Sequence, residues 1–241
     1  MIYIVTPGII YPEYYFEDTL FSKENWTFFN VSDKKIINDN YQIMNYSDIN
    51  YIGLGKWFAE AEVIYNIYKL GIYKDYDYIG FLHQDYVLLN NNKNKLITST
   101  INNIIETKNP SFISFFTHTF IQDYNQHIMM DEKYPNILVG NGRNCYYTIL
   151  EQYNNFFNKN IQIDDLNNKK INLCSSFLLQ KNIFENLMAW ISFIIESKYL
   201  DKFDYDHKYR FHGGMIERYI AIYTSQIEIC ELGLWHNSGR K

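Results

Sequence analysis

The sequence predicts an α/β domain with a mainly parallel central sheet, and three observations support this fold class. A continuous apolar run from Tyr78 to Leu82 stops abruptly at the polar triplet His83-Gln84-Asp85, as expected of a central strand covered by helices on both faces. Segments with strand character alternate with segments of helical spacing, which is typical of βαβ units. Hydrophobic residues make up 47% of the 241-residue chain, enough for a sizeable core. We therefore expect a single domain over residues 1–241, an α/β/α sandwich.

The expected elements follow from local composition and periodicity. Strands are expected where β-branched and aromatic residues run together, at 2–5, 26–31, 78–82, 111–116, 171–179 and 227–232. Helices are expected where apolar residues recur three and four positions apart, at 56–70, 95–106, 145–158, 182–197 and from Met215 onward. Gly71 and the pair Asn109-Pro110 are plausible helix stops. Between Thr117 and Asn144 the periodicity is lost, so a long loop is expected there.

Composition excludes several classes of protein. The net charge is −5 and no long run of Lys and Arg occurs, which argues against nucleic-acid binding. The three cysteines, Cys145, Cys174 and Cys230, lack CxxC spacing, so neither a disulfide framework nor a zinc site is expected. No apolar run reaches the roughly 18 residues of a transmembrane helix, and the first residues do not resemble a signal peptide. These features favour a soluble, cytoplasmic protein. Asn is abundant, as in AT-rich genomes, so Asn clusters receive little weight.

Polar residues follow three of the expected strands. Thr6, Asp33 and Asp85 would meet at one edge of the sheet if these strands are parallel, and ligands of open α/β sheets bind at that edge. A nucleotide base and ribose could dock beside Thr6 and Asp33, although Asp33 is equally well explained as the opening of a turn. His83 and Asp85 are suited to a divalent metal, whereas the simpler interpretation is a polar turn after a strand.

The glycine pair Gly213-Gly214 suggests a tight turn in which the backbone approaches a ligand closely. A helix beginning near Met215 would then hold Glu217 in its first turn, where the helix dipole favours an ionised carboxylate. The alternative is that Glu217 and Arg218 form a structural pair at the helix end.

Three segments in order carry a resemblance to a known family. They run from Glu60 through the triplet at His83, from Leu173 to Leu179 with Phe184 and Trp190, and from Gly213 to Arg218. Together they resemble the glycosyltransferases of capsular and exopolysaccharide biosynthesis clusters, which are similar to nucleotide-sugar transferases with the GT-A fold. The resemblance covers roughly 57–223, without the long middle loop. The family usually has His-Tyr-Arg-Arg-Tyr where this chain has His83-Gln84-Asp85-Tyr86, so a basic pair is lost and a carboxylate is gained.

The resemblance implies a metal-assisted hexosyltransferase that moves a sugar from a nucleoside-diphosphate sugar to a glycan or protein-linked acceptor. Residues 1–116 would form the nucleotide-sugar half, and 117–241 the acceptor half and tail. The changed triplet is similar to the Asp-x-Asp metal motif, so Asp85 would bind Mn²⁺ or Mg²⁺ and His83 would stand beside the donor. The ending from His236 to Lys241 is similar to a His-x-x-Gly-x-Lys ending, which implies that His236 binds the metal and Lys241 the diphosphate; the alternative, equally well supported for His236, is a frayed terminus with no fixed role. Glu217 would act as general base if the reaction inverts the anomeric centre.

Two other functions are considered. A non-catalytic nucleotide-sugar or glycan-binding protein on a degenerate GT-A fold is compatible with the changed triplet. A nucleotidyltransferase is disfavoured, because the first strand is not followed by the Gly-rich loop with Arg and Lys that such enzymes use to hold a triphosphate.

Overall fold

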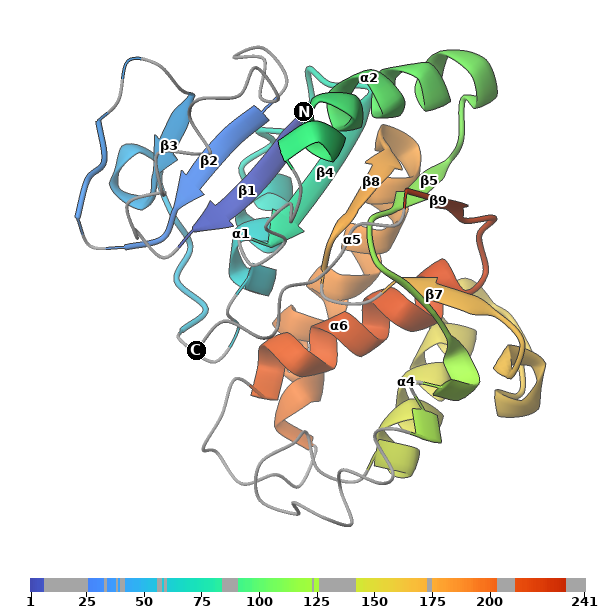
Figure 1. Cartoon of the computed structure of the whole chain (residues 1–241). Coiled ribbons are helices and arrows are strands. Elements are labelled where there is room, and N and C mark those ends of the chain that lie inside the picture. The colour runs from blue at the N-terminus through green and yellow to red at the C-terminus, as the bar shows by residue number, and fades with distance from the viewer. Residues whose placement is uncertain are drawn as a thin grey trace.

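A seven-stranded sheet forms the centre of the molecule (Figure 1). The computed structural model describes residues 1–6, 26–32, 34–37, 39, 42–55, 58, 60–83, 91–122, 124–125, 142–172, 175–202 and 211–232. The strands lie in the order β3 (Ile43–Asn45), β2 (Trp26–Asn30), β1 (Ile2–Thr6), β4 (Tyr78–His83), β8 (Phe177–Gln180), β5 (Phe112–Ser114) and β9 (Cys230–Glu231). Among these described strands, β8 runs antiparallel to both neighbours and every other adjacent pair is parallel. The predicted mainly parallel sheet is confirmed.

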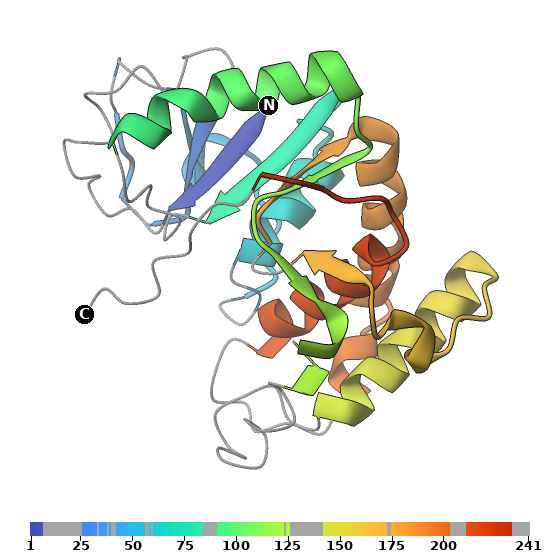
Figure 2. The same ribbon diagram turned by 45° about the vertical axis from the view of Figure 1, so that its right-hand side comes forward.

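Helices cover both faces of the sheet (Figure 2). On one face, Ile101 and Ile104 of α2 (Asn91–Lys108) pack in a small core with apolar residues of β1, β2, β4 and β8. On the other face, α1 (Glu60–Lys69) and α5 (Lys181–Glu196) enclose a larger core, which continues into α4 (Gly142–Phe157) and α6 (Phe211–Thr224). The α/β/α layering expected from the sequence is therefore confirmed.

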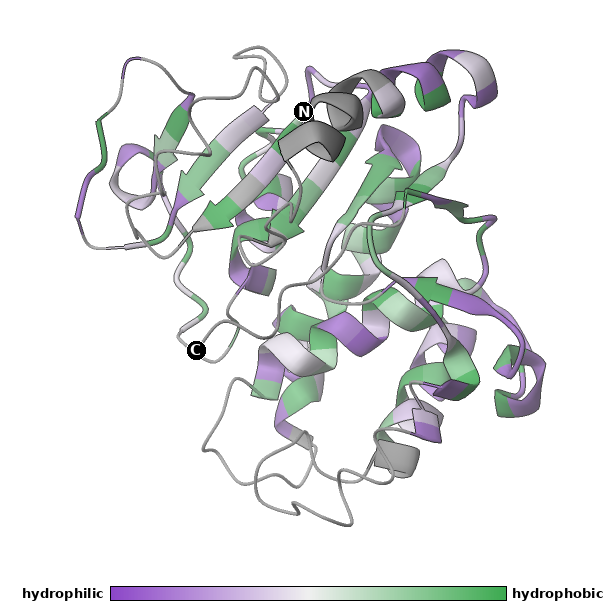
Figure 3. Ribbon diagram, in the orientation of Figure 1, coloured by the Kyte–Doolittle hydropathy of each residue, from purple (hydrophilic) through white to green (hydrophobic). Residues whose placement is uncertain are grey.

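The central strands are mostly apolar because both of their faces are buried (Figure 3). In β4, Ile79 and Phe81 face the larger core, whereas Leu82 faces the core under α2. All five residues of β2 are buried as well. A strand with two covered faces needs no alternation of polar and apolar residues, which explains why the apolar run at β4 predicted a central strand.

Gly80 of β4 pairs with Leu178 of β8, and little space is left beside its Cα. A Cβ atom on Gly80 would meet Leu178 Cδ1 at 2.8 Å and the Phe177 carbonyl oxygen at 2.9 Å, both inside normal contact distance. Backbone cannot move aside as a flexible side chain can. We expect Gly80→Ala to lower the free energy of unfolding by about 1–3 kcal/mol. The matched control is Gly53→Ala, because a Cβ there meets nothing within 4 Å. Chemical denaturation measures both; equal stabilities of the two variants would contradict the close packing.

The expected single strand over 171–179 is wrong. The segment forms two strands in different sheets: β7 (Lys170–Asn172) pairs with β6 (Thr117–Thr119), and β8 belongs to the central sheet. Ser175, two residues before β8, has a positive φ of 47°. The side-chain amide of Asn172, the last residue of β7, donates to the Ser176 carbonyl at 2.7 Å. β6 also occupies the start of the segment that was expected to be a loop.

The helix at Gly213-Gly214 begins earlier than expected. The sequence predicts a tight turn there and a helix from Met215, but α6 begins at Phe211 and includes both glycines. Phe211 is buried, and the His212 ring stacks on Phe58 with centroids 4.6 Å apart and planes at 10°. This burial outweighs the cost of two helical glycines, each about 1 kcal/mol relative to alanine.

Other boundaries agree with the sequence to within a few residues. Gly71, with φ of 68°, ends α1 as expected, and Asn109 ends α2 with φ of 42°. The final strand shortens from the expected 227–232 to β9. The three-residue β3 and the short 3-10 helices η2 (Tyr46–Asp48), η3 (Ile163–Leu166) and η4 (Tyr199–Lys202) have no counterpart among the expected elements.

Candidate functional site

The parallel strands β1, β2 and β4 end at the same level. Thr6, the last residue of β1, pairs with Asn30, the last residue of β2. Val5 pairs with His83, the last residue of β4. Three strand ends therefore line one edge of the sheet, which we call the carboxyl edge, and this is where open α/β sheets bind ligands.

The structure brings two of the predicted site residues, Thr6 and His83, to this carboxyl edge. Asp33 and Asp85 lie outside the described residues, but they follow the strand-end residues Asn30 and His83 by three and two positions in the sequence. His236 and Lys241 also lie outside the described residues. The contributions of these four side chains stay predictions.

Two buried asparagines organise the loop that follows β2. The Asn30 side chain is fully buried and donates to the Lys34 carbonyl at 2.7 Å and to Asn45 Oδ1 at 2.9 Å. Its own Oδ1 accepts from the backbone N–H of Ser32 at 3.1 Å and from the Ser32 hydroxyl at 2.9 Å. An amide side chain has two donor hydrogens and two acceptor lone pairs, and Asn30 uses all of them. Ser32 and Lys34 are thereby attached to the end of β2.

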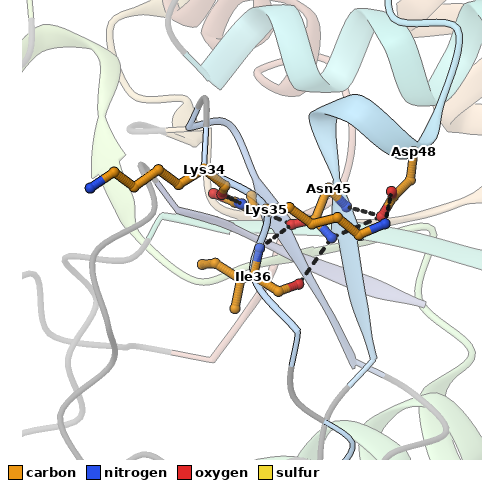
Figure 4. A network of polar contacts seen from close by, with 6 residues as sticks. Lys34, Lys35, Ile36, Asn45 and Asp48 are labelled. Atoms are coloured by element: carbon orange, nitrogen blue, oxygen red, sulfur yellow. Dashed lines mark hydrogen bonds and ion pairs between the residues drawn. The ribbon is translucent and has the colours of Figure 1, made fainter.

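Asn45, the last residue of β3, makes the second set of contacts (Figure 4). Its Oδ1 accepts from the Ile36 N–H at 2.8 Å and its Nδ2 donates to the Ile36 carbonyl at 3.0 Å, so that the side chain pairs with the backbone at two points. The same Nδ2 donates to Asp48 Oδ2 at 2.8 Å. With the bond from Asn30, this buried amide is also fully satisfied, and such a network is rigid.

Asp48 links the network to the surface. Lys35 Nζ lies 2.6 Å from Asp48 Oδ1 (Figure 4). The hydrogen bond from Lys35, followed by that from Asn45, lowers the pKa of the Asp48 carboxyl below its ordinary value. A lowered carboxyl pKa contributes stability that is present above the unfolded-state pKa and is lost as the pH falls through the folded one. The network should therefore be intact at neutral pH and weaken only in acid.

A second loop, between β3 and α1, is held in the same manner. Asn66, fully buried in α1, accepts from the Ile52 N–H at 2.7 Å and donates to the Ile52 carbonyl at 3.0 Å. Glu62, one turn earlier, accepts hydrogen bonds from the backbone N–H groups of Leu54 and Gly55. In the described parts of the chain, the segments that follow β2 and β3 are thus each held by a buried asparagine side chain.

Helix α6 lies on the side of the sheet toward which the arrowheads of β1 and β4 point (Figures 1 and 2). Glu217 is its seventh residue and is half-buried. The expectation that Glu217 lies in the first helical turn is wrong, so the helix dipole, whose effect fades within one turn, does not explain an ionised carboxylate. Arg218 is buried and donates to the Gly214 carbonyl of the same helix.

The described residues contain no group of three or more His, Cys, Asp or Glu side chains that could hold a metal ion. The predicted metal ligands Asp85 and His236 are not among these residues, so the metal site stays a prediction. In the same part of the chain, no helix combines the length and apolar character needed to cross a membrane.

Comparisons with known proteins support the fold. No family model matches the sequence, and no curated protein matches it. The structure is similar to that of the bifunctional glycosyltransferase WbbM in its apo form, with a TM-score of 0.55 and 15% sequence identity. The match covers 97% of this chain and 44% of the WbbM chain, so this chain spans less than half the length of that protein. At this identity the likeness concerns the fold, and the expected GT-A-like architecture is confirmed at that level.

Asn30, Asn45 and Asp48 were not among the predicted site residues, although the sequence contains a signal for them. The pattern Asn-x-Ser-Asp occurs twice, at 30–33 and at 45–48, and each copy begins on the last residue of a strand. Short polar side chains at strand ends commonly bond to nearby backbone. The repeat was not recognised because Asn residues were given little weight in a chain with so many of them.

Proposed function

We propose that this chain is a glycosyltransferase that moves a sugar from a nucleoside-diphosphate sugar to a glycan or protein-linked acceptor. The observation that carries the proposal is the alignment of the ends of β1, β2 and β4 at one carboxyl edge, beside a loop fixed by buried amides. The likeness of the whole chain to a glycosyltransferase structure supports the same reading. Membership of the capsular and exopolysaccharide transferases is part of this proposal.

In the proposed arrangement, the nucleoside part of the donor lies along the carboxyl edge. Thr6 and Asp33 contact the base and ribose, and His83 stands beside the diphosphate. A divalent cation such as Mn²⁺, bound by Asp85 and His236, would supply neutralisation of the charge that develops on the leaving diphosphate. Lys241 would add a positive charge to the same group. The proposed boundary near residue 116 separates a donor half from an acceptor half. The two halves share the central sheet, because β8 of the second half lies between β4 and β5 of the first.

Glu217 is the proposed general base on the acceptor side. The first turn of α6 contacts the segment between β3 and α1, because His212 stacks on Phe58. This contact ties α6 to the end of the sheet where the donor would bind. A carboxylate on α6 can accept the proton of an acceptor hydroxyl in an inverting transfer.

A nucleotide-release assay tests the proposal. The purified chain is incubated with Mn²⁺ and, in turn, with the sugar nucleotides of uridine, guanosine, cytidine and adenosine, and the released nucleotide is measured. A transferase is expected to release nucleotide slowly from its own donor even without acceptor, because water replaces the acceptor hydroxyl. Binding of a sugar nucleotide without release would instead support the non-catalytic binding protein. If the chain neither binds any of these sugar nucleotides nor releases nucleotide from them, both proposed functions are contradicted.

A further inference from the structure

The loop after β2 depends on the side chain of Asn45. Asn45 bonds to Ile36 at the far end of the loop and to Asn30 at the near end. Asn30 in turn holds Ser32 and Lys34. The loop is thus attached to the sheet at both ends, and Asn45 is the residue that joins the two attachments.

Within the loop, the Ser32 side chain contacts the backbone of Lys34. The Ser32 hydroxyl, which donates to Asn30, accepts from the Lys34 N–H at 3.3 Å and lies 3.0 Å from the Lys34 carbonyl oxygen. The Lys34 side chain itself is exposed and extends away from the network (Figure 4). The backbone at Ser32, Lys34 and Ile36 is therefore held in place by hydrogen bonds, which is a form suited to binding a ligand without reordering.

We propose that Asn45 is a positioning residue for donor binding, which holds Ser32, Lys34 and Ile36 of the loop after β2 in place for the nucleoside part of the donor. This inference rests on the proposed function. A loop that is already ordered loses less conformational entropy when a ligand binds, so its preorganisation appears directly in the affinity. Disturbing Asn45 should weaken nucleotide binding, although Asn45 does not touch the nucleotide.

The chain provides a matched control for this proposal. Asn154, in the last turn of α4, pairs with Ile161 in the same two-point manner, with bonds of 3.0 Å to Oδ1 and 2.8 Å from Nδ2. β3 and α4 lie on opposite sides of the molecule (Figure 1). An Asn→Asp change keeps the shape of the side chain and removes the same Nδ2 donation at either site, but only one site adjoins the carboxyl edge.

The test compares Asn45→Asp with Asn154→Asp by calorimetric titration with UDP, GDP, CDP and ADP in the presence of Mn²⁺. For the nucleotide that the unmodified chain binds, we expect Asn45→Asp to raise the Kd about tenfold or more, and Asn154→Asp to leave it within about twofold. Both variants should lose thermal stability. Equal Kd values for the two variants would overturn the proposal, because a purely structural role would affect both sites alike.

Two further variants complete the test. Asn45→Asp combined with Asp48→Asn restores a donor for the bond between positions 45 and 48 and removes the repulsion of two carboxylates, so part of the lost affinity should return. Ser32→Ala removes one attachment of the loop at a partly exposed residue and should raise the Kd a few-fold without lowering the melting temperature.

If Asn45→Asp does not fold, an unchanged Kd in Ser32→Ala overturns the proposal. If the unmodified chain binds none of the four nucleotides, the proposed function fails first, and the inference fails with it.

Discussion

Replacing Glu217 with glutamine is expected to lower the turnover number about 10²–10⁴-fold while the donor Kd changes little. Glutamine keeps the size of the side chain and most of its hydrogen bonds, but it cannot accept a proton, so the change separates chemistry from packing. The magnitude is that usually observed when a general base is removed. Steady-state kinetics with saturating donor, together with a donor titration, measures both quantities.

The control for Glu217 is Glu151→Gln on α4, where the side chain is exposed. This variant should retain full turnover. A Glu217→Gln variant that loses thermal stability and activity together would make Glu217 a structural residue of α6. Near-normal turnover would place the base elsewhere, or would indicate a reaction that retains the anomeric configuration and needs no such base.

Replacing Asp85 with alanine is expected to abolish the effect of Mn²⁺ on nucleotide binding. In the unmodified chain, Mn²⁺ should strengthen nucleoside-diphosphate binding, because the cation offsets the repulsion between the diphosphate and nearby carboxylates. Without the Asp85 carboxylate, the affinities with and without Mn²⁺ should be equal. Calorimetric titration of each variant in Mn²⁺ and in a chelator gives the comparison.

Asp164→Ala serves as the matched control for Asp85, because Asp164 is an exposed carboxylate on η3. Its removal should leave the Mn²⁺ effect intact. If the unmodified chain binds the nucleotide equally well with and without Mn²⁺, the site works without a metal ion. The charge of the diphosphate would then be balanced by protein groups, of which His83 and Lys241 are the candidates.

The sequence predicts the centre of the fold well because burial on two faces leaves a clear signal. The strands β1, β2 and β4 are mainly apolar up to their last residue, and their ends could be placed at one edge before the structure was known. β3 and β6 could not be predicted, since each has three residues and is defined mainly by its pairing with a distant segment. The break between β7 and β8 depends on Ser175 and on the Asn172 side chain, which interrupt an otherwise apolar stretch.

The asparagines of the candidate site could not be predicted from the sequence, for a different reason. Asn30, Asn45, Asn66 and Asn154 have specific roles, whereas many other Asn residues of this chain are exposed. Composition alone cannot separate these two groups, because an amide pairs with a backbone segment only when the fold brings that segment near. The start of α6 was predicted wrongly for a related reason. Gly213 and Gly214 favour a turn locally, but the burial of Phe211 and His212 extends the helix across them.

The central claim, that a nucleotide binds at the carboxyl edge, is tested most directly by hydrogen exchange of the backbone amides. The free chain is compared with the chain saturated by the nucleoside diphosphate that it binds, in Mn²⁺. A ligand that binds only the folded form suppresses local opening, so exchange slows where it binds. We predict slower exchange in the peptides that contain Thr6, the loop Ser32–Ile36 and His83, with α4 and α5 unchanged. Protection confined to α4 and α5, with these three segments unaffected, would contradict the account.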